Sequence, residues 1–434
     1  MREDKSSIAL LIIIVVVLCY FVFFRADVFD ITYNPDDSEK TDNNFSDILN
    51  LNNDLYSNYN NDISNENTIG KYNNNIDNVI QENDSSSYKK FYYSQLNDIQ
   101  KNIYLKIEKG CQNHQKSIKL DKVGREDMTI ASYAISMDHP EFFWTRKYSF
   151  DIINDEYVTN IYYEIPDDVD MLVSSIDSKV NSIFEEIVSQ NIENNYDKIK
   201  FFYEWIINNT EYGERSDSQE ITSVFVNNTS VCAGYSKAFL YLCQKADIEC
   251  AYVSGYTNQN EKHAWNLVKL GDNYYWIDVT WGDPVYAGEK DNRINYNYFL
   301  VDDSDFFTNH IIERGVESSW DYNINKTFEF PNCTDDSLSY YKSNGSYFNT
   351  YDSFLISSYI KDKFRNGIYQ NIELKFNDSE QYNSFLYEFI EKDNARIYED
   401  VKAVNPMFYG TISISYETIE SANYVKISID LVKM

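Results

Sequence analysis

Residues 263–280 read HAWNLVKLGDNYYWIDVT, two apolar runs rich in aromatic and β-branched residues on either side of Gly271-Asp272-Asn273. Glycine and aspartate between two such runs are typical of the short turn of a β-hairpin. If Gly271 and Asp272 are the two central turn residues, Leu270 pairs with Asn273 and the register of both strands is fixed. The stretch therefore predicts an antiparallel sheet.

This register brings a histidine and an acid to one face of the hairpin. His263 falls opposite Thr280, and Asp278 falls opposite Trp265. Asp278 is then a diagonal neighbour of His263, roughly 7–8 Å away at Cα, whereas a slip of one residue would move it to the other face. An unpaired carboxylate in an otherwise apolar strand would be costly to bury, so His263 is its predicted partner.

Upstream, residues 230–243 read SVCAGYSKAFLYLC and show helical spacing of their apolar side chains. Thr229 or Ser230 is placed to cap this helix, and Cys232 then lies in its first turn. Unpaired N–H groups and the positive end of the helix dipole stabilise a thiolate there. Cys232 is thus the predicted nucleophile, whereas Cys243 and Cys250 fit ordinary buried cysteines.

Cys232, His263 and Asp278 together predict a catalytic triad in which the base activates a thiol and the acid orients the base. The backbone N–H of Cys232 is the predicted oxyanion donor, with Gln219 as a candidate side-chain donor. A second set of residues, which could wall a substrate groove or simply pack the core, comprises Tyr235, Trp265 and Trp281.

Three blocks, VCAGYSKAF, HAWNLV and YYWIDVTWGDP, occur in this order and resemble the motifs of the transglutaminase-like superfamily. The resemblance covers about residues 196–284 and implies a papain-like α+β core, with the cysteine on a helix packed against an antiparallel sheet. The Gln100…Tyr104 pair and Asp138–Trp144 look like the lead-in segment of secreted bacterial members. The resemblance implies a structural rather than a catalytic role for His139 in this segment. Superfamily members include cross-linking enzymes, proteases, amidases and inactive scaffolds, and a filled triad favours an enzyme.

The composition excludes some partners. The 434 residues carry a net charge of −31, which repels the phosphate backbone of nucleic acids. The chain has four histidines, and neither a CxxC pair nor a calcium loop of the D-x-[DN]-x-[DN]-G type accompanies the catalytic blocks. We therefore expect no metal and no cofactor.

The N-terminal part suggests attachment to a membrane. Residues 8–24 are an unbroken apolar run without a small-residue cleavage pattern, so residues 1–25 are predicted to be an uncleaved signal anchor, with a cleaved signal peptide as the alternative. Residues 26–87, rich in Asn, Asp and Ser, are expected to form a flexible stalk. The rest would lie outside the cell, where five cysteines leave at least one thiol unpaired.

Periodicity divides the remainder into an α/β lead-in (88–195), the catalytic core (196–331) and a small α+β accessory domain (335–434). The expected helices are 92–107 (ended by Gly110), 172–187, 196–208, 353–366 and 382–389. The expected strands, besides the hairpin, are 148–153, 157–165, 250–254, 372–376, 410–416 and 424–431.

Together these features predict an extracellular, membrane-anchored thiol enzyme that acts on peptide or protein amides as a hydrolase or an acyltransferase. Its substrate would be a peptide or a protein, with a cell-wall or surface protein as one candidate. The alternative is a cell-surface peptide-binding or adhesion scaffold that uses the same fold without turnover.

Overall fold

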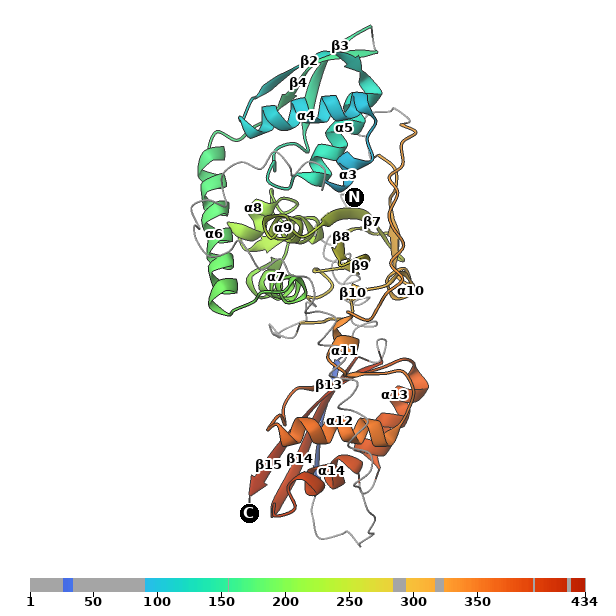
Figure 1. Ribbon diagram of the computed structural model, residues 1–434. Helices are drawn as coiled ribbons and strands as arrows, with labels where there is room; N and C mark the ends of the chain where they lie inside the picture. Colours follow the sequence, from blue (N-terminus) through green and yellow to red (C-terminus); the bar gives the residue numbers. More distant parts are fainter. Residues whose placement is uncertain are drawn as a thin grey trace, which may run out of the picture. The chain divides into compact units, whose positions relative to one another are not determined.

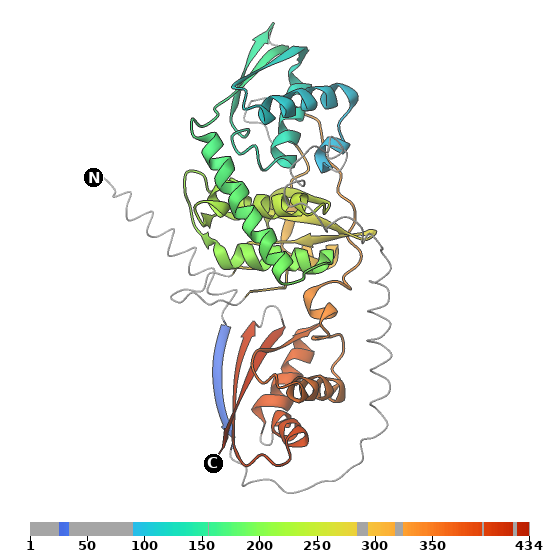
Figure 2. The same cartoon turned by 60° about the vertical axis from the view of Figure 1, so that its left-hand side comes forward.

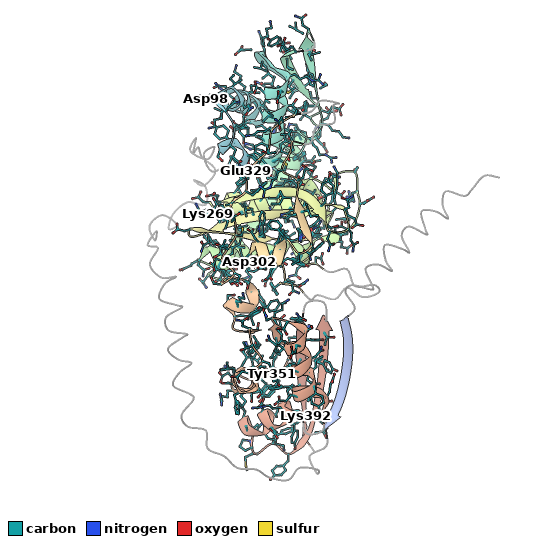
Figure 3. All side chains as sticks on the ribbon, turned by 90° about the vertical axis from the view of Figure 1, so that its right-hand side faces the viewer. Asp98, Lys269, Asp302, Glu329, Tyr351 and Lys392 are labelled. Carbon is teal, nitrogen blue, oxygen red and sulfur yellow. The ribbon has the colours of Figure 1, made fainter. Side chains whose placement is uncertain are left out.

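The computed structural model describes residues 26–33, 90–154, 156–283, 294–316, 324–392, 395–419 and 423–433, the first of these by backbone alone. They form two compact units. One consists of residues 90–346, and the other combines residues 26–33 with residues 347–433. In both units side chains fill the space between helices and sheet (Figure 3).

The first unit begins with a three-stranded antiparallel sheet in the order β2-β4-β3, against which helices pack (Figure 1). Its elements are α3 (Phe91–Ser94), α4 (Asp98–Gln112), β2 (Ser117–Gly124), α5 (Arg125–Asp138), β3 (Tyr148–Ile153) and β4 (Tyr157–Tyr163). Asn97 and Gln100 form a capping box at the start of α4. β3 and β4 were predicted from alternation, whereas β2 and α5 were not.

Gly110 does not end the first long helix, as the sequence suggested. α4 continues to Gln112, and Gly110 is a buried residue within it. A Cβ at this position would lie 2.3 Å from Cδ1 of Ile118 on β2. The glycine therefore permits close packing of the helix on the strand. In the sequence, a glycine with this packing role cannot be told from one that ends a helix.

Asp138 and His139 hold segments of this lead-in through buried polar contacts, and a structural role was expected for His139. The buried carboxylate of Asp138 accepts hydrogen bonds from the backbone N–H groups of Tyr92 and Tyr93, at 3.0 and 2.8 Å. The buried His139 imidazole lies between two carboxylates, 3.1 Å from Glu108 and 2.8 Å from Glu141. Nothing in this arrangement leaves His139 open to a substrate.

The second half of the unit carries the predicted catalytic blocks. Its helices and short strands are α6 (Val169–Ser189), α7 (Asn195–Asn209), β5 (Glu211–Tyr212), α8 (Ile221–Phe225), β6 (Thr229–Ser230), α9 (Cys232–Lys245), α10 (Asp303–Phe306) and α11 (Tyr340–Ser343). Its antiparallel sheet, in the order β10-β9-β8-β7-β11, consists of β7 (Cys250–Thr257), β8 (Lys262–Leu270), β9 (Asn273–Ile277), β10 (Phe299–Val301) and β11 (His310–Ile312). α9 packs against β7 and β8 (Figure 1).

The β8–β9 hairpin has the predicted register. Leu270 pairs with Asn273, and Asn266 pairs with Ile277. Gly271 has a φ of +58°, the conformation that mirror-image hairpin turns need. The pairing ends at Ile277, so Asp278 lies just beyond the last paired residue of β9.

The second unit is an α+β layer with helices on one side of a five-stranded sheet (Figure 2). Its elements are β12 (Tyr347–Phe348), α12 (Ser353–Arg365), β13 (Ile372–Phe376), α13 (Ser379–Phe385), the π-helix η5 (Leu386–Glu391), α14 (Arg396–Val404), β14 (Gly410–Ile419) and β15 (Tyr424–Lys433). α12 is followed by Gly367 at a φ of +75°, in line with the expected stop signal.

Residues 26–33 differ from the flexible stalk that was expected there. They form strand β1 (Ala26–Tyr33), which pairs antiparallel with β14 from Ala26 opposite Ile419 to Tyr33 opposite Ile412. Asn and Asp dominate the stretch as a whole, but this segment, ADVFDITY, is rich in the β-branched and aromatic residues that favour strands. The remaining stalk residues, 34–87, lie outside the described residues.

The predicted membrane localisation is wrong on the structure. Across the ranges that the structure describes, no helix combines the length and the apolar character needed to cross a bilayer. The longest, α6, has 21 residues but is amphipathic. One face is buried, and charged residues such as Asp177 and Glu185 are not part of that face. The apolar run 8–24, on which the prediction rested, lies outside the described residues.

The C-terminal unit contains a buried acid with a testable effect on stability. Asp400 on α14 is 4% exposed and accepts a hydrogen bond from Ser357 on α12. Burial raises its pKa to about 6, above the roughly 3.9 of an unfolded chain. The folded unit therefore binds the proton more tightly, so this stabilisation is fully present below about pH 4 and is lost as the pH rises through about 6.

Asp400→Asn is expected to stabilise the unit by about 2 kcal/mol above pH 7 and by almost nothing at about pH 4. All six tryptophans precede residue 347, so the measurement is hydrogen exchange of peptides from α12 and α14 rather than tryptophan fluorescence. Asp362→Asn, at a side chain that is 56% exposed on α12, is the matched control and should change nothing. A destabilised Asp400→Asn protein at high pH would contradict the prediction.

Candidate active site

Cys232 is the first residue of α9, and it is the partly exposed member of the five cysteines that the structure describes. The other four, which the structure also shows as free thiols, are buried: Cys111, Cys243, Cys250 and Cys333. The helix is not capped by Thr229 or Ser230, as the sequence suggested; its N-cap is Val231, without a side-chain hydrogen bond. The start of the helix thus lacks a side-chain acceptor that would compete with a thiolate.

Ser230 has another task, which explains the glycine two residues after the cysteine. The Ser230 hydroxyl donates to the carbonyl of Ser218 at 2.9 Å and lies 2.6 Å from the hydroxyl of Ser223. A Cβ on Gly234 would lie 2.0 Å from the Ser230 hydroxyl and 2.7 Å from the Ser218 carbonyl. Gly234 therefore allows the first turn of α9 to press against the segment before it, which fixes the position of Cys232.

The structure brings Cys232, His263 and Asp278 together. Nε2 of His263 lies 2.6 Å from Oδ2 of Asp278. The Cys232 thiol lies close enough to the same imidazole to contribute to its raised pKa. Asp278 is fully buried and the His263 side chain is 6% exposed, so water competes little for these contacts.

The charges in the site reinforce one another. Burial alone would lower the pKa of His263, but the negative charge of Asp278 and the hydrogen bonds to Asp278 and Cys232 outweigh it and raise the pKa to about 10. Burial alone would likewise raise the pKa of Asp278, but His263 and His310 hold it well below its usual range. The imidazole therefore carries a positive charge at neutral pH and can stabilise a thiolate on Cys232.

His310, which the sequence analysis did not single out, is the fourth member of this group. Its Nε2 lies 3.1 Å from Oδ2 of Asp278, the same oxygen that His263 contacts. It comes from β11, which pairs with β7 at the edge of the sheet. The signal that could have found it is the scarcity of histidine, since the chain has only four.

The predicted groove aromatics need correction. Tyr235 and Trp265 are both 0% exposed and cannot wall an open groove. The Tyr235 hydroxyl donates to Asp283, 2.8 Å away, and Trp265 packs edge-on against His310 at 4.9 Å. Trp281 is only partly buried and stacks on the His263 ring at 5.2 Å, so it covers one side of the imidazole.

Gln219, the side-chain oxyanion donor that the sequence suggested, and Tyr212 are two polar residues upstream of the cysteine. Gln219 is exposed, and its amide oxygen accepts a hydrogen bond from Arg146 of the lead-in. Tyr212 on β5 is 48% exposed. Its partial burial and the nearby charges of Cys232 and Asp278 raise its pKa well above the usual range, so the hydroxyl keeps its proton. Tyr212 is a second residue that sequence reasoning missed.

Within the described ranges, His263, Asp278 and His310 are also a group whose ligand atoms, all within 4.8 Å of one another, could hold a metal ion. The distances argue for hydrogen bonds instead. Both imidazole nitrogens that face the Asp278 carboxylate must carry protons to donate to it, at 2.6 and 3.1 Å. A protonated nitrogen has no lone pair for a metal, so we assign the group to a hydrogen-bonded network.

This arrangement, a thiol on a helix start against a sheet that carries histidine and aspartate, defines a papain-like α+β core of the transglutaminase type. Residues 184–281 match the model of the transglutaminase-like superfamily, so this segment of the chain is transglutaminase-like. The matched range contains all three predicted triad residues.

The chain is similar to kyphoscoliosis peptidase, with 25% identity over 151 residues to the mouse protein and 26% over 165 residues to the human protein. These alignments cover 31% and 33% of this chain but only 22% and 25% of the two relatives, so the chain spans about a quarter of their length.

Two solved structures are similar to part of the chain. One is a TGase, at 15% identity over 34% of this chain and 46% of that one, with a TM-score of 0.24. The other is a candidate cysteine protease from Cytophaga hutchinsonii, at 18% identity over 31% of this chain and 61% of that one, with a TM-score of 0.22.

Proposed function

We propose that the protein is a thiol enzyme that acts on peptide or protein amides through Cys232, His263 and Asp278. The observation that carries the proposal is a partly exposed thiol at a helix start, beside a buried imidazole that lies 2.6 Å from a buried carboxylate. Most free cysteines are buried and inert, and an isolated ion pair of this kind would be costly to bury without a use. The similarity to kyphoscoliosis peptidase agrees with this class of activity.

The chemistry follows from the protonation states. The Cys232 thiolate attacks the amide carbonyl carbon, a C–S bond forms, and the carbonyl oxygen takes the negative charge. As the C–N bond breaks, the His263 imidazolium delivers its proton to the leaving amine, and Asp278 keeps the imidazole oriented. Water or a second amine then attacks the thioester and returns a proton to His263. The C–S bond breaks, and the thiolate is restored. Water gives hydrolysis, and an amine gives transamidation.

We propose two donors for the oxyanion: the backbone N–H of Cys232, at the start of α9, and the Tyr212 hydroxyl. Tyr212→Phe is expected to slow acylation of Cys232 by about tenfold to a hundredfold, because one donor to the developing charge is lost while the ring remains. The measurement is the pre-steady-state burst of p-nitrophenolate from p-nitrophenyl acetate. Iodoacetamide alkylation, which develops no oxyanion, is the control and should be unaffected. Equal slowing of both reactions would contradict the role.

The proposal is tested by the rate of Cys232 alkylation with iodoacetamide, followed by mass spectrometry of the cysteine-containing peptide. At about pH 6 the rate should exceed that of N-acetylcysteine by about a hundredfold, since a free thiol with a pKa near 8.5 is mostly protonated there. His263→Ala should remove the excess. A wild-type rate equal to that of N-acetylcysteine would refute the enzyme and leave a peptide-binding scaffold as the better interpretation.

The fate of the acyl group needs its own experiment. Incubating the protein with a glutamine-containing peptide and a primary amine separates two outcomes by mass. A shorter peptide, or a glutamine residue converted to glutamate with release of ammonia, indicates hydrolysis, and an amine adduct indicates acyl transfer. Cys232→Ala is the control in which neither product should form.

A further inference from the structure

His310 lies on β11, the edge strand of the sheet beside the predicted active site. Its side chain is 0% exposed. Aromatic rings surround the imidazole: Phe306 stacks on it at 3.9 Å, Trp281 lies at 4.4 Å and Trp265 at 4.9 Å. A polar ring in such a place needs its hydrogen bonds satisfied.

The two ring nitrogens face different partners. Nε2 lies 3.1 Å from Oδ2 of Asp278, whereas Nδ1 lies 2.7 Å from Oδ1 of Asn309 and 3.2 Å from the carbonyl oxygen of Phe306. If the proton were on Nδ1, the lone pair of Nε2 would point at the Asp278 carboxylate in a site without water. This repulsion assigns the proton to Nε2, which donates to Asp278.

Asn309 can satisfy the other nitrogen. Its amide lies between Nδ1 of His310 and the hydroxyl of Tyr298, which is 2.8 Å from it. With the amide nitrogen towards His310 and the amide oxygen towards Tyr298, the amide donates to Nδ1 and accepts from the tyrosine. Asn309 and Tyr298 then have complementary partners, and His310 keeps its proton on Nε2. The donated bond from Asn309 offsets the contact of the Nδ1 lone pair with the Phe306 carbonyl oxygen, 3.2 Å away.

The Asp278 carboxylate is thereby held from three sides. Oδ2 accepts from His263 at 2.6 Å and from His310 at 3.1 Å. Oδ1 accepts from the backbone N–H of Trp281 at 3.0 Å. His310 thus gives Oδ2 a second donor, so the oxygen that orients His263 is held between two imidazoles while Trp281 holds the other oxygen.

We propose that His310 is a positioning residue that holds the Asp278 carboxylate in the orientation required to direct His263 towards Cys232. The inference rests on the proposed triad and adds to it a second imidazole that acts through the acid. Besides these groups, three titratable side chains face this cluster. Tyr203 and Tyr212 interact electrostatically with Asp278, and the Tyr298 ring packs against His310.

A pair of amide variants tests the role. In His310→Gln the side-chain amide nitrogen can reach the place of Nε2 and still donate to Asp278, whereas in His310→Asn it reaches only the place of Nδ1. The rate of Cys232 alkylation by iodoacetamide at about pH 6 should fall about tenfold in His310→Asn and stay within about twofold of wild type in His310→Gln, because a hydrogen bond to a charged group is lost in one and kept in the other. At about pH 10, where a free thiol is ionised without help, all three rates should agree within about twofold.

Phe306→Leu is the structural control, because it removes the ring that stacks on His310 but no hydrogen bond to Asp278. It should lower the melting temperature without changing the alkylation rate at about pH 6. Equal rates in His310→Asn and His310→Gln, or an equal loss in Phe306→Leu, would overturn the inference while the wild-type rate stays high. Failure of the proposed function would be recognised separately, as a slow wild-type protein.

Discussion

Replacing Asp278 with asparagine is expected to slow the acylation of Cys232 by at least about a hundredfold. The carboxylate carries the charge that keeps His263 protonated and accepts the hydrogen bond at 2.6 Å that sets the ring's orientation. An asparagine of the same shape loses the charge and can present an N–H where His263 needs an acceptor. The thiol would then lose both its cationic partner and the geometry of proton transfer.

The measurement is the burst of p-nitrophenolate from p-nitrophenyl acetate, supported by alkylation of Cys232 across a pH series. Asp283→Asn is the matched control. Asp283 lies near the site but accepts its hydrogen bond from Tyr235, so its replacement should cost less than about threefold. A loss below tenfold in Asp278→Asn would mean that another group orients His263.

The second large effect concerns the ion pair that anchors α9. Lys237 is 7% exposed, and its ammonium lies 2.6 Å from the carboxylate of Glu220 just before α8. Glu220→Gln leaves this charge buried without its counter-charge, and is expected to destabilise the 90–346 unit by about 3 kcal/mol. Urea unfolding followed by tryptophan fluorescence measures it, because every tryptophan of the chain belongs to this unit.

The double change Glu220→Gln with Lys237→Met should recover most of the lost stability, because the unpaired charge is then gone. Glu329→Gln is the comparison at an exposed pair, since Glu329 is 80% exposed and lies 3.6 Å from Arg314; it should cost less than about 0.5 kcal/mol. If the double variant is as unstable as Glu220→Gln alone, the loss does not come from the stranded lysine.

The hairpin that carries His263 was predictable because its information is local. A glycine at positive φ and a strict period of two fix the register, and the register then places Asp278 near His263. The nearness of Cys232 could not follow from local pattern. It depends on how α9 packs against β7 and β8, and only the family resemblance suggested it.

His310 and Tyr212 were out of reach for the same reason. β11 is three residues long and joins the sheet through β7, more than 50 residues earlier in the chain. β5 has two residues and pairs with β6, which lies directly before Cys232. Such short strands have no periodicity to read, and their side chains reach the site only through non-local pairing.

The position of Cys232 also has a consequence for oxidation. A thiolate that reacts readily with carbonyl groups also reacts with peroxide, and a nearby second thiol is needed to trap the sulfenic acid as a disulfide. Cys243, on the same helix, lies eleven residues further on, about 16 Å along the axis at the usual rise. The other described cysteines are buried in the folded protein. None of the described cysteines is therefore placed to protect Cys232. In the absence of a thiol in solution, peroxide should carry it past the sulfenic acid to a sulfinic acid, which thiol reductants do not restore.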